Sequence, residues 1–176
     1  GHAILTRIYY VMKFLSYILG ALCLHGSGTL SLAQTYQHFE GRQTHPVALS
    51  PDGKRLFALN TPEARLCVFD VSNAANPEPV LVDEIPVGLE PVSLAARTND
   101  EVWVVNEVGD SVSIVNVAQR VVVDTLTASD EPADVVFAQG KAYVSCARNN
   151  LIRVFDAVSE LGYVHNHLAR SLSSSK

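Results

Sequence analysis

Three residues with side chains able to bind a cation or a polar ligand recur at equivalent places in this sequence. His45, Glu90 and Glu131 each stand directly before a proline, and these three prolines lie 45 and 41 residues apart. An imidazole and two carboxylates that a repeated fold brings together could hold a polar ligand, and a residue before proline favours extended backbone, which would give the three side chains a shared orientation. The alternative is that they are ordinary solvated charges. We take them as the candidate ligand-binding residues and assign no catalytic or metal-binding residue.

Other polar residues recur at fixed repeat positions and invite a functional interpretation. A residue type that returns in every repeat more often caps a strand end or bonds a turn than performs chemistry, so we interpret this set as structural. No Ser/His/Asp triad, phosphate-binding glycine loop or Gly-x-Ser-x-Gly motif is readable in the sequence. The set comprises Asn60, Asp70, Asn106, Asn116 and Asp156.

Composition limits the partners that the chain can have. The formal net charge is −5, whereas a nucleic-acid partner would require a basic face. None of the three cysteines lies in a C-x-x-C or C-x-x-C-H arrangement, and no Cys/His cluster has zinc-ligand spacing. The sequence therefore predicts no nucleic-acid partner and no cofactor.

The residues before the prolines belong to three similar units between positions 45 and 157. Each unit opens with an x-Pro run and continues into two short β-rich runs whose ends are ten residues apart, at 60 and 70, 106 and 116, and 146 and 156. A fourth run follows in the first two units, at 79–87 and 121–128. A period of about 40–45 residues with four short strands per unit is the signature of a β-propeller blade.

Apolar runs within these segments indicate how the strands are covered. VWVV (102–105), CVF (67–69) and VVV (121–123) are continuously apolar, as expected of a sheet that is buried on both faces. A β-sandwich built from the same strands is the competing fold. We predict an all-β, partial β-propeller of three four-stranded antiparallel blades at 45–88, 89–130 and 131–157, the last incomplete. In such an arrangement Cys67 and Cys146 lie in non-adjacent blades, too far apart for a disulfide.

Two short segments predict specific turns. Pro51-Asp52-Gly53 combines a preset φ, an aspartate that bonds its own backbone and a glycine that accepts positive φ. In the third unit Gln139-Gly140 is placed for a two-residue hairpin.

The block HPVALSPDGKRLFALN…RLCVFDV, repeated in weaker form, resembles the YVTN family of β-propeller repeats. FALN and VVNE stand for the YVTN core, and the resemblance covers residues 45–157, about two thirds of the chain. Cys146 departs from the pattern, because the motif asparagine is missing there. The resemblance implies a secreted or periplasmic propeller, typically of seven blades, among relatives that include surface-layer-like proteins, lactonase-like enzymes and propellers attached to haem domains.

The N-terminal part reads as an export signal. Residues 1–11 precede the expected start at Met12, which is followed by a lysine, eleven uncharged residues and a small-x-small site ending at Ala33. A membrane anchor is the alternative, but eleven apolar residues cover only about half of a roughly 30 Å hydrocarbon core. We expect a signal peptide at 12–33, a linker at 34–44 and a periplasmic or secreted mature protein that is not in the membrane.

The C-terminal residues 158–176 contain no repeat, and we interpret them as a non-repeat tail on a truncated propeller. These features favour a non-catalytic binding or scaffold protein that binds a protein or a small polar ligand through its blade loops. The alternative is the N-terminal part of a propeller enzyme, either a lactonase-like hydrolase or a redox protein with a downstream haem domain. A structural surface repeat protein is the third possibility.

Overall fold

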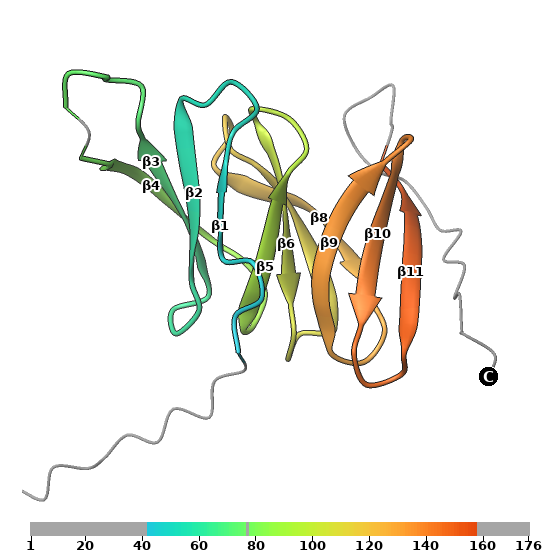
Figure 1. Cartoon of the computed structure of the whole chain (residues 1–176). Coiled ribbons are helices and arrows are strands. Elements are labelled where there is room, and N and C mark those ends of the chain that lie inside the picture. Colours follow the sequence, from blue (N-terminus) through green and yellow to red (C-terminus); the bar gives the residue numbers. More distant parts are fainter. Residues whose placement is uncertain (1–41, 77, 158–176) are drawn as a thin grey trace, which may run out of the picture. The chain divides into compact units, whose positions relative to one another are not determined.

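The computed structural model describes residues 42–76 and 78–157, and these residues fold entirely as strands and turns (Figure 1). The strands run in chain order as β1 (Val47–Leu49), β2 (Arg55–Asn60), β3 (Arg65–Asp70), β4 (Val80–Pro86), β5 (Pro91–Ala96), β6 (Glu101–Asn106), β7 (Ser111–Asn116), β8 (Val121–Thr127), β9 (Pro132–Ala138), β10 (Lys141–Cys146) and β11 (Leu151–Asp156). Within these ranges no helix has the length and apolarity needed to cross a membrane. The predicted signal peptide and the C-terminal tail lie outside the described residues.

The strands form three antiparallel sheets, each made from one sequence unit. The first sheet has the order β1-β2-β3-β4, the second β5-β6-β7-β8, and the third β9-β10-β11 within the described residues. The predicted strand order, which follows chain order, is therefore confirmed. A β-sandwich would have mixed strands from different units in one sheet, and the pairing excludes it.

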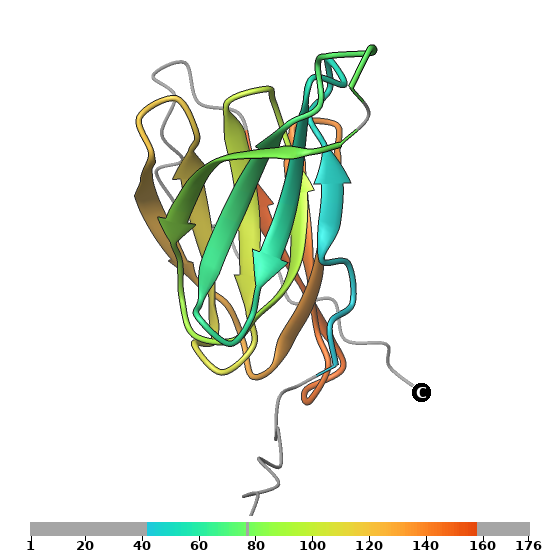
Figure 2. The same cartoon turned by 90° about the vertical axis from the view of Figure 1, so that its left-hand side faces the viewer.

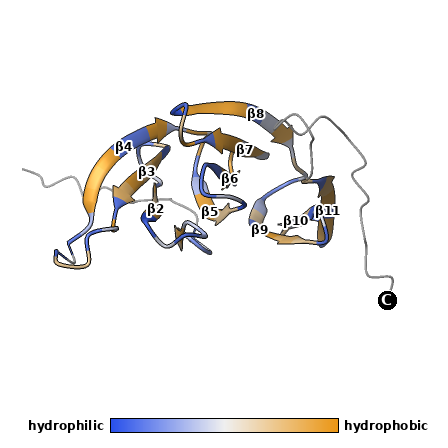
Figure 3. Ribbon diagram, turned by 90° about the horizontal axis from the view of Figure 1, so that it is seen from above, coloured by the Kyte–Doolittle hydropathy of each residue, from blue (hydrophilic) through white to orange (hydrophobic). Residues whose placement is uncertain are grey.

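The sheets pack face to face, and two apolar clusters fill the spaces between them. Between the first and second sheets lie residues such as Phe57, Leu66 and Val102, and between the second and third lie Trp103, Val144 and others. Viewed from above, the sheets stand side by side with β4 and β8 along one side (Figure 3). We name the side of a sheet that points to the next sheet in the chain its forward face, and the opposite side its rear face.

Burial along the strands follows from this stacking. Side chains alternate between the two faces of a strand, so a sheet covered on one face alternates in burial and a sheet covered on both does not. In β6, in the middle sheet, five consecutive residues are buried, whereas in β10, in the third sheet, buried and partly exposed residues alternate. The continuous apolar runs in the sequence are thus explained for the middle sheet by cover on both faces.

Both predicted turns are present. The amide of Gly53, at φ 69°, donates to the Ser50 carbonyl at 2.8 Å, and the Asp52 carboxylate accepts the amide of Lys54 at 3.1 Å. Gln139 and Gly140 both have positive φ, 50° and 72°, which is the backbone of a type I′ hairpin turn. This turn twists in the same sense as the strands β9 and β10 that it joins.

The two cysteines in the described ranges, Cys67 and Cys146, are buried free thiols, as predicted. Burial raises the pKa of both thiols, because a thiolate is disfavoured away from water. They behave as small apolar side chains within the first and third sheets.

Candidate functional site

The residues before the repeat prolines lie near one end of the sheets, which we name the proline rim: His45, Glu90 and Glu131 with the turns at 61–64, 107–110 and 147–150. Antiparallel pairing places the start of each inner strand beside the end of the next strand, as Pro91 beside Asn106 shows. Neighbouring sheets share this end, because the Thr61 hydroxyl donates to the Pro91 carbonyl at 2.7 Å. The proline rim therefore runs across all three sheets.

The backbone at Glu90 and Glu131 differs from the expectation. Both residues have left-handed φ, 54° and 52°, so the predicted extended conformation before proline is wrong at these two positions. The strand pairing shifts register at the start of β5 and at the start of β9, which is a β-bulge arrangement. The conformation turns each glutamate carbonyl toward the residue that follows the neighbouring strand: Glu107 N–H donates to Glu90 O, and Ala147 N–H to Glu131 O, both at 2.9 Å.

His45 is held differently from the two glutamates. Its amide donates to the Val92 carbonyl at 3.3 Å, and its carbonyl accepts the Leu94 amide at 2.9 Å, in a parallel bridge with Ser93. The histidine thus lies beside the middle of β5, whereas Glu90 precedes the start of that strand. The His45 side chain is exposed. The backbone beside His45 shows no register shift like those beside Glu90 and Glu131. A common backbone conformation before the repeat proline is therefore found at the two glutamates but not at His45.

Glu107 is a rim residue that sequence reasoning missed. It follows β6 directly, and its carboxyl pKa is raised above the usual value, first by burial and then by repulsion from Glu90 and Glu131. The field of both glutamates thus reaches the same carboxyl group. Hairpin register could have revealed Glu107, because the first residue after β6 must stand opposite the residue before Pro91.

Glu131 is held by hydrogen bonds at both its backbone amide and its carbonyl, and its carboxylate forms an ion pair. Its amide donates to the Asp110 carboxylate at 3.1 Å, which joins the second and third sheets at the rim. Its carboxylate lies 3.4 Å from the Arg148 guanidinium, and both side chains are well exposed. The Glu131 carboxylate thus reaches this part of the rim already paired with an arginine.

The acidic side chains of this rim come from separate connections between strands. In the described ranges no group of three or more His, Cys, Asp and Glu side chains is placed to hold a metal. Carboxylates at separate turns instead offer several acceptors spread over a surface. Such a surface attracts positive charge, and salt weakens the attraction.

The recurring Asn and Asp residues mostly bond turns, as predicted. Asn60 accepts the amide of Glu63 at 3.3 Å, Asn116 that of Gln119 at 2.9 Å, and Asp70 that of Ser72 at 2.8 Å. Asp156 instead pairs with Lys141 on the adjacent strand. These contacts stop strands and close turns, so none of these residues is part of the candidate site.

Asn106 occupies the position of Asn60 in the second sheet but is fully buried. Its amide nitrogen donates to the hydroxyls of Ser113, at 2.9 Å, and Ser111, at 3.2 Å. The Ser113 hydroxyl also accepts the Gly88 amide at 3.2 Å. A Cβ on Gly88 would lie 2.4 Å from the Asn106 amide nitrogen, so only glycine fits there. This cluster fixes the connection that leads to Glu90.

Comparison with known proteins supports the architecture. No known family model matches the sequence, and no curated protein matches it. Among solved structures, a Kuenenia stuttgartiensis hydrazine synthase matches with a TM-score of 0.57 and 25% identity over 69% of this chain and 35% of that one. A putative 6-phosphogluconolactonase from Bacteroides uniformis matches with a TM-score of 0.59 and 20% identity over 72% and 44%. A protein of unknown function from Desulfotomaculum acetoxidans matches with a TM-score of 0.58 and 17% identity over 72% and 42%.

The three sheets are part of a β-propeller. The chain spans between 35% and 44% of the length of these solved chains, so it corresponds to a portion of each. In a propeller the strands β1, β5 and β9 are the inner strands of their blades, because each is first in its sheet. The proline rim is therefore one end of the propeller, where the inner strands begin.

Proposed function

We propose that this chain is the blade-bearing part of a non-catalytic β-propeller of the YVTN-repeat type, a binding or scaffold protein whose proline rim binds a basic segment of a partner protein. The observation that carries the proposal is geometric: the same left-handed backbone places Glu90 and Glu131 at one end of adjacent sheets, where their carbonyls accept the amides of Glu107 and Ala147. The raised pKa of Glu107, to which Glu90 and Glu131 contribute after burial, agrees with this placement. Repulsion among these groups is relieved when a positive charge arrives. A rigid sheet framework supports loops that recognise partners.

A protein segment fits this rim better than a small ion. The three glutamates come from the β4–β5 connection, the β6–β7 turn and the β8–β9 connection, so they are carried by separate loops. Lysine and arginine side chains spaced along a loop or peptide can reach separate acceptors. The proposal also covers small polar ligands that carry several hydrogen-bond donors.

Binding of a lysine-rich peptide tests the proposal directly. We expect the chain to bind it in calorimetry, to bind a glutamate-rich peptide of equal length far less, and to lose affinity as salt is raised. The double variant Glu90→Gln, Glu131→Gln removes two charges at the rim and should weaken binding several-fold, since exposed charge pairs are each worth about 0.2–1 kcal/mol.

The matched control removes the same charge away from the rim. Glu78 precedes β4 and Asp124 lies within β8, so the double variant Glu78→Gln, Asp124→Asn has the same net charge as the rim variant. It should bind the peptide like the wild type. Equal losses in both double variants would mean that only net charge matters and that the rim is no binding site.

The alternative is the N-terminal part of a propeller enzyme, a lactonase-like hydrolase or a redox protein with a haem domain further along. The likeness to the hydrazine synthase chain, at 25% identity, favours it, since this chain spans 35% of that one. The full-length gene distinguishes the candidates. A C-x-x-C-H motif downstream would support a redox enzyme, and repeats followed by an anchor would support a surface protein.

We further propose that the protein is exported and works in the periplasm or outside the cell, on the basis of the sequence at 12–33. N-terminal sequencing of the protein secreted from a bacterial host checks this. Cleavage after Ala33 should leave Gln34 as the first residue. Retention of the uncleaved chain in the membrane would instead support an anchor.

A further inference from the structure

Among the large apolar side chains of the described residues, the two with the highest exposure stand on the proline rim of the second sheet. Leu89 is 64% exposed and Val108 is 62% exposed. Leu89 precedes Glu90 in the β4–β5 connection, and Val108 follows Glu107 in the β6–β7 turn. In Figure 2 the turns of the proline rim lie at the lower end of the sheets. Each apolar residue is thus the chain neighbour of a rim carboxylate.

The two segments that carry these side chains lie side by side. The Glu107 amide donates to the Glu90 carbonyl at 2.9 Å, and the Gly109 amide donates to the Leu89 carbonyl at 3.3 Å. Val108 therefore stands between two residues that are both bonded to the Leu89–Glu90 segment. A Cβ on Gly109 would lie 3.4 Å from the Leu89 amide nitrogen, so the two backbones are close. We name Leu89 and Val108 the apolar pair.

The other two units show that the fold does not require aliphatic residues at these positions. The β2–β3, β6–β7 and β10–β11 turns share one backbone form, because the fourth residue of each has a left-handed φ, at 52°, 45° and 50°. The residues equivalent to the apolar pair are also exposed. They are Pro62 and Arg148 for Val108, and Thr44 and Asp130 for Leu89. Two exposed aliphatic side chains at these positions are therefore a property of the second unit and not of the turn.

The apolar pair belongs to the middle sheet, whose two neighbouring sheets are both described. The forward face of this sheet packs on the third sheet, and its rear face packs on the first. Further blades of a propeller would join the outer faces of the first and third sheets and would not lie against the second. The exposure of the apolar pair therefore does not depend on the number of blades.

The loops that carry the apolar pair are fixed from below by Asn106. The Gly88 backbone passes over this buried side chain directly before Leu89, and the Gly88 amide donates to the Ser113 hydroxyl at 3.2 Å. A Cβ on Gly109, directly after Val108, would lie 3.3 Å from the Asn106 Cβ. Loops held in this way lose little conformational freedom when a partner binds, which favours recognition.

We propose that the partner segment bound at the proline rim is amphipathic: a large apolar side chain contacts Leu89 and Val108, and an adjacent lysine or arginine reaches Glu90 or Glu107. This inference rests on the proposed function, since it specifies which basic segment the rim prefers. An apolar contact surrounded by charged groups is the usual arrangement at the centre of a protein interface. A segment with only basic residues would leave the apolar pair in water.

Calorimetry with three peptides of equal length tests this preference. The first carries lysines separated by glycine and serine, the second has leucine in place of each serine, and the third keeps the leucines but replaces lysine with glutamine. The wild type should bind the second about tenfold more tightly than the first, as expected when two methylene groups leave water. It should not bind the third measurably. Salt should weaken binding of both lysine peptides but preserve their ratio, because it screens charge and not apolar contact.

Substitutions at the apolar pair test where the preference arises. The double variant Leu89→Thr, Val108→Thr removes aliphatic surface without changing charge, and it should bind the two lysine peptides with equal affinity. The matched control Val80→Thr, Val121→Thr changes two exposed valines that begin β4 and β8, at the end of the sheets away from the rim. It should keep the preference of the wild type. All four side chains are exposed, so circular dichroism of both variants should match the wild type.

The outcomes separate this inference from the proposed function. If the wild type binds the two lysine peptides equally, the proposed function stands and the amphipathic preference is wrong. If the preference persists in the Leu89→Thr, Val108→Thr variant, or is also lost in the control, the apolar pair does not cause it. Binding of the third peptide as tightly as the second would contradict the role of the carboxylates. A wild type that binds neither lysine peptide would refute the proposed function and this inference with it.

Discussion

The buried amide of Asn106 shows how a single side chain can fix the path of the rim. The strand-end asparagine of the first sheet, Asn60, bonds an exposed turn, whereas Asn106 bonds two serines inside the molecule. The Gly88 backbone passes directly over it. Since Gly88 stands two residues before Glu90, the placement of the rim carboxylate depends on this close approach.

Gly88→Ala should destabilise the chain, because the new methyl group would come 2.4 Å from the Asn106 amide nitrogen. Overpacking of this kind costs about 1–3 kcal/mol. Urea unfolding followed by tryptophan fluorescence measures it. Gly53→Ala is the control for backbone conformation alone, since a Cβ there meets nothing within 4 Å although φ is 69°. A smaller loss at Gly88 than at Gly53 would contradict the clash.

Glu107 should make stability depend on pH. Its pKa is higher in the folded chain than in the unfolded chain, so its protonated form favours folding. The stability that this proton contributes is complete below the unfolded pKa and is lost as pH rises through the folded pKa. Glu107→Gln should therefore raise the melting temperature at neutral pH relative to the wild type, and the gain should shrink on acidification.

The pKa of Glu107 also reports whether Glu90 and Glu131 act on it electrostatically. In the double variant Glu90→Gln, Glu131→Gln, the Glu107 pKa should fall toward its usual value, although burial keeps it somewhat raised. Carbon-detected NMR titration of the Glu107 side chain measures the change. A Glu107 pKa unaltered by the double substitution would mean that the three carboxyl groups are not electrostatically linked.

For single residues, the sequence predicted which side chains bond turns better than it predicted backbone conformation. The turn roles of Asn60 and Asn116 could be predicted, because repetition alone marks them as structural. The left-handed backbone of Glu90 and Glu131 could not, because the bulge arises from pairing with a neighbouring strand and overrides the preference of a residue before proline. Glu107 escaped notice because it has no proline beside it to mark the repeat.

At the scale of the element, turn chemistry and strand length agree closely with the structure. The six runs RLFALN, RLCVFD, EVWVVN, SVSIVN, KAYVSC and LIRVFD become β2, β3, β6, β7, β10 and β11 with the predicted ends. Two of these runs begin just after a turn with a positive-φ glycine: β2 follows the Gly53 turn and β10 follows Gly140. The beginnings of these two strands were therefore predictable from local chemistry. The register shifts within β4 and β8 were not, since they depend on partner strands.

Substitutions at Gln139 and Gly140 test whether the hairpin turn is of type I′. Both residues have positive φ, so Gly140→Val should cost about 1–2 kcal/mol, because a branched residue is strained there. Gln139→Asn should instead stabilise the chain slightly, because asparagine tolerates this backbone best after glycine. Thermal unfolding of both variants measures the two effects. Equal stability of Gly140→Val and wild type would mean that the turn is not of type I′.

At the scale of the whole molecule, repetition of one packing interface explains why the architecture was readable. Every strand has a counterpart 40–46 residues away in a neighbouring sheet. Sheet composition and sheet-to-sheet packing could therefore be predicted from the repeat alone. The identity of a ligand could not be predicted in the same way, because it depends on loops that differ between repeats. The sequence therefore places the rim carboxylates at one end of the fold without indicating what would bind there.

The two aromatic residues Trp103 and Tyr143 stand at equivalent strand positions, and among the described residues only Trp103 is fully buried. Trp103 is fully buried, stacks edge-on against Phe137 with ring centres 5.3 Å apart, and donates its indole N–H to the Glu101 carboxylate at 2.7 Å. Trp103→Ala should therefore cost about 3–5 kcal/mol of folding free energy at any protein concentration.

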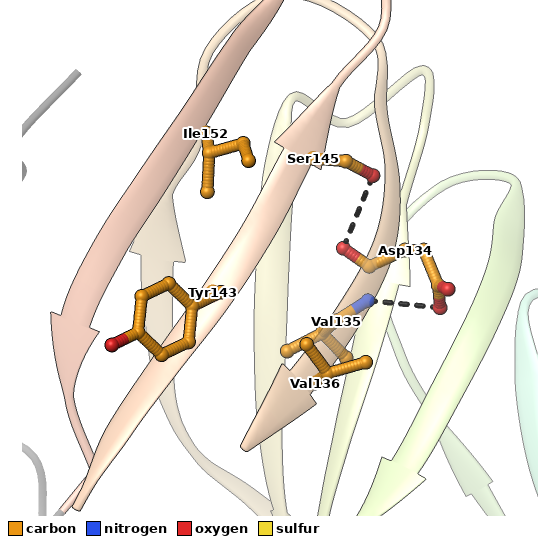
Figure 4. A pocket seen from close by; sticks show the side chains of 6 residues that line it. All are labelled: Asp134, Val135, Val136, Tyr143, Ser145 and Ile152. Carbon is orange, nitrogen blue, oxygen red and sulfur yellow. Dashed lines mark hydrogen bonds between the residues drawn. The ribbon is translucent and has the colours of Figure 1, made fainter. Parts of the chain in front are cut away.

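Tyr143→Ala should cost much less, because the Tyr143 ring is only partly buried among the described residues and lines a hollow of the third sheet (Figure 4). The free energy lost on truncating a side chain grows with the packed apolar contact that is removed. Urea unfolding of both variants, with the wild type as reference, measures the two losses. A loss at Tyr143 as large as the loss at Trp103 would contradict this difference in burial.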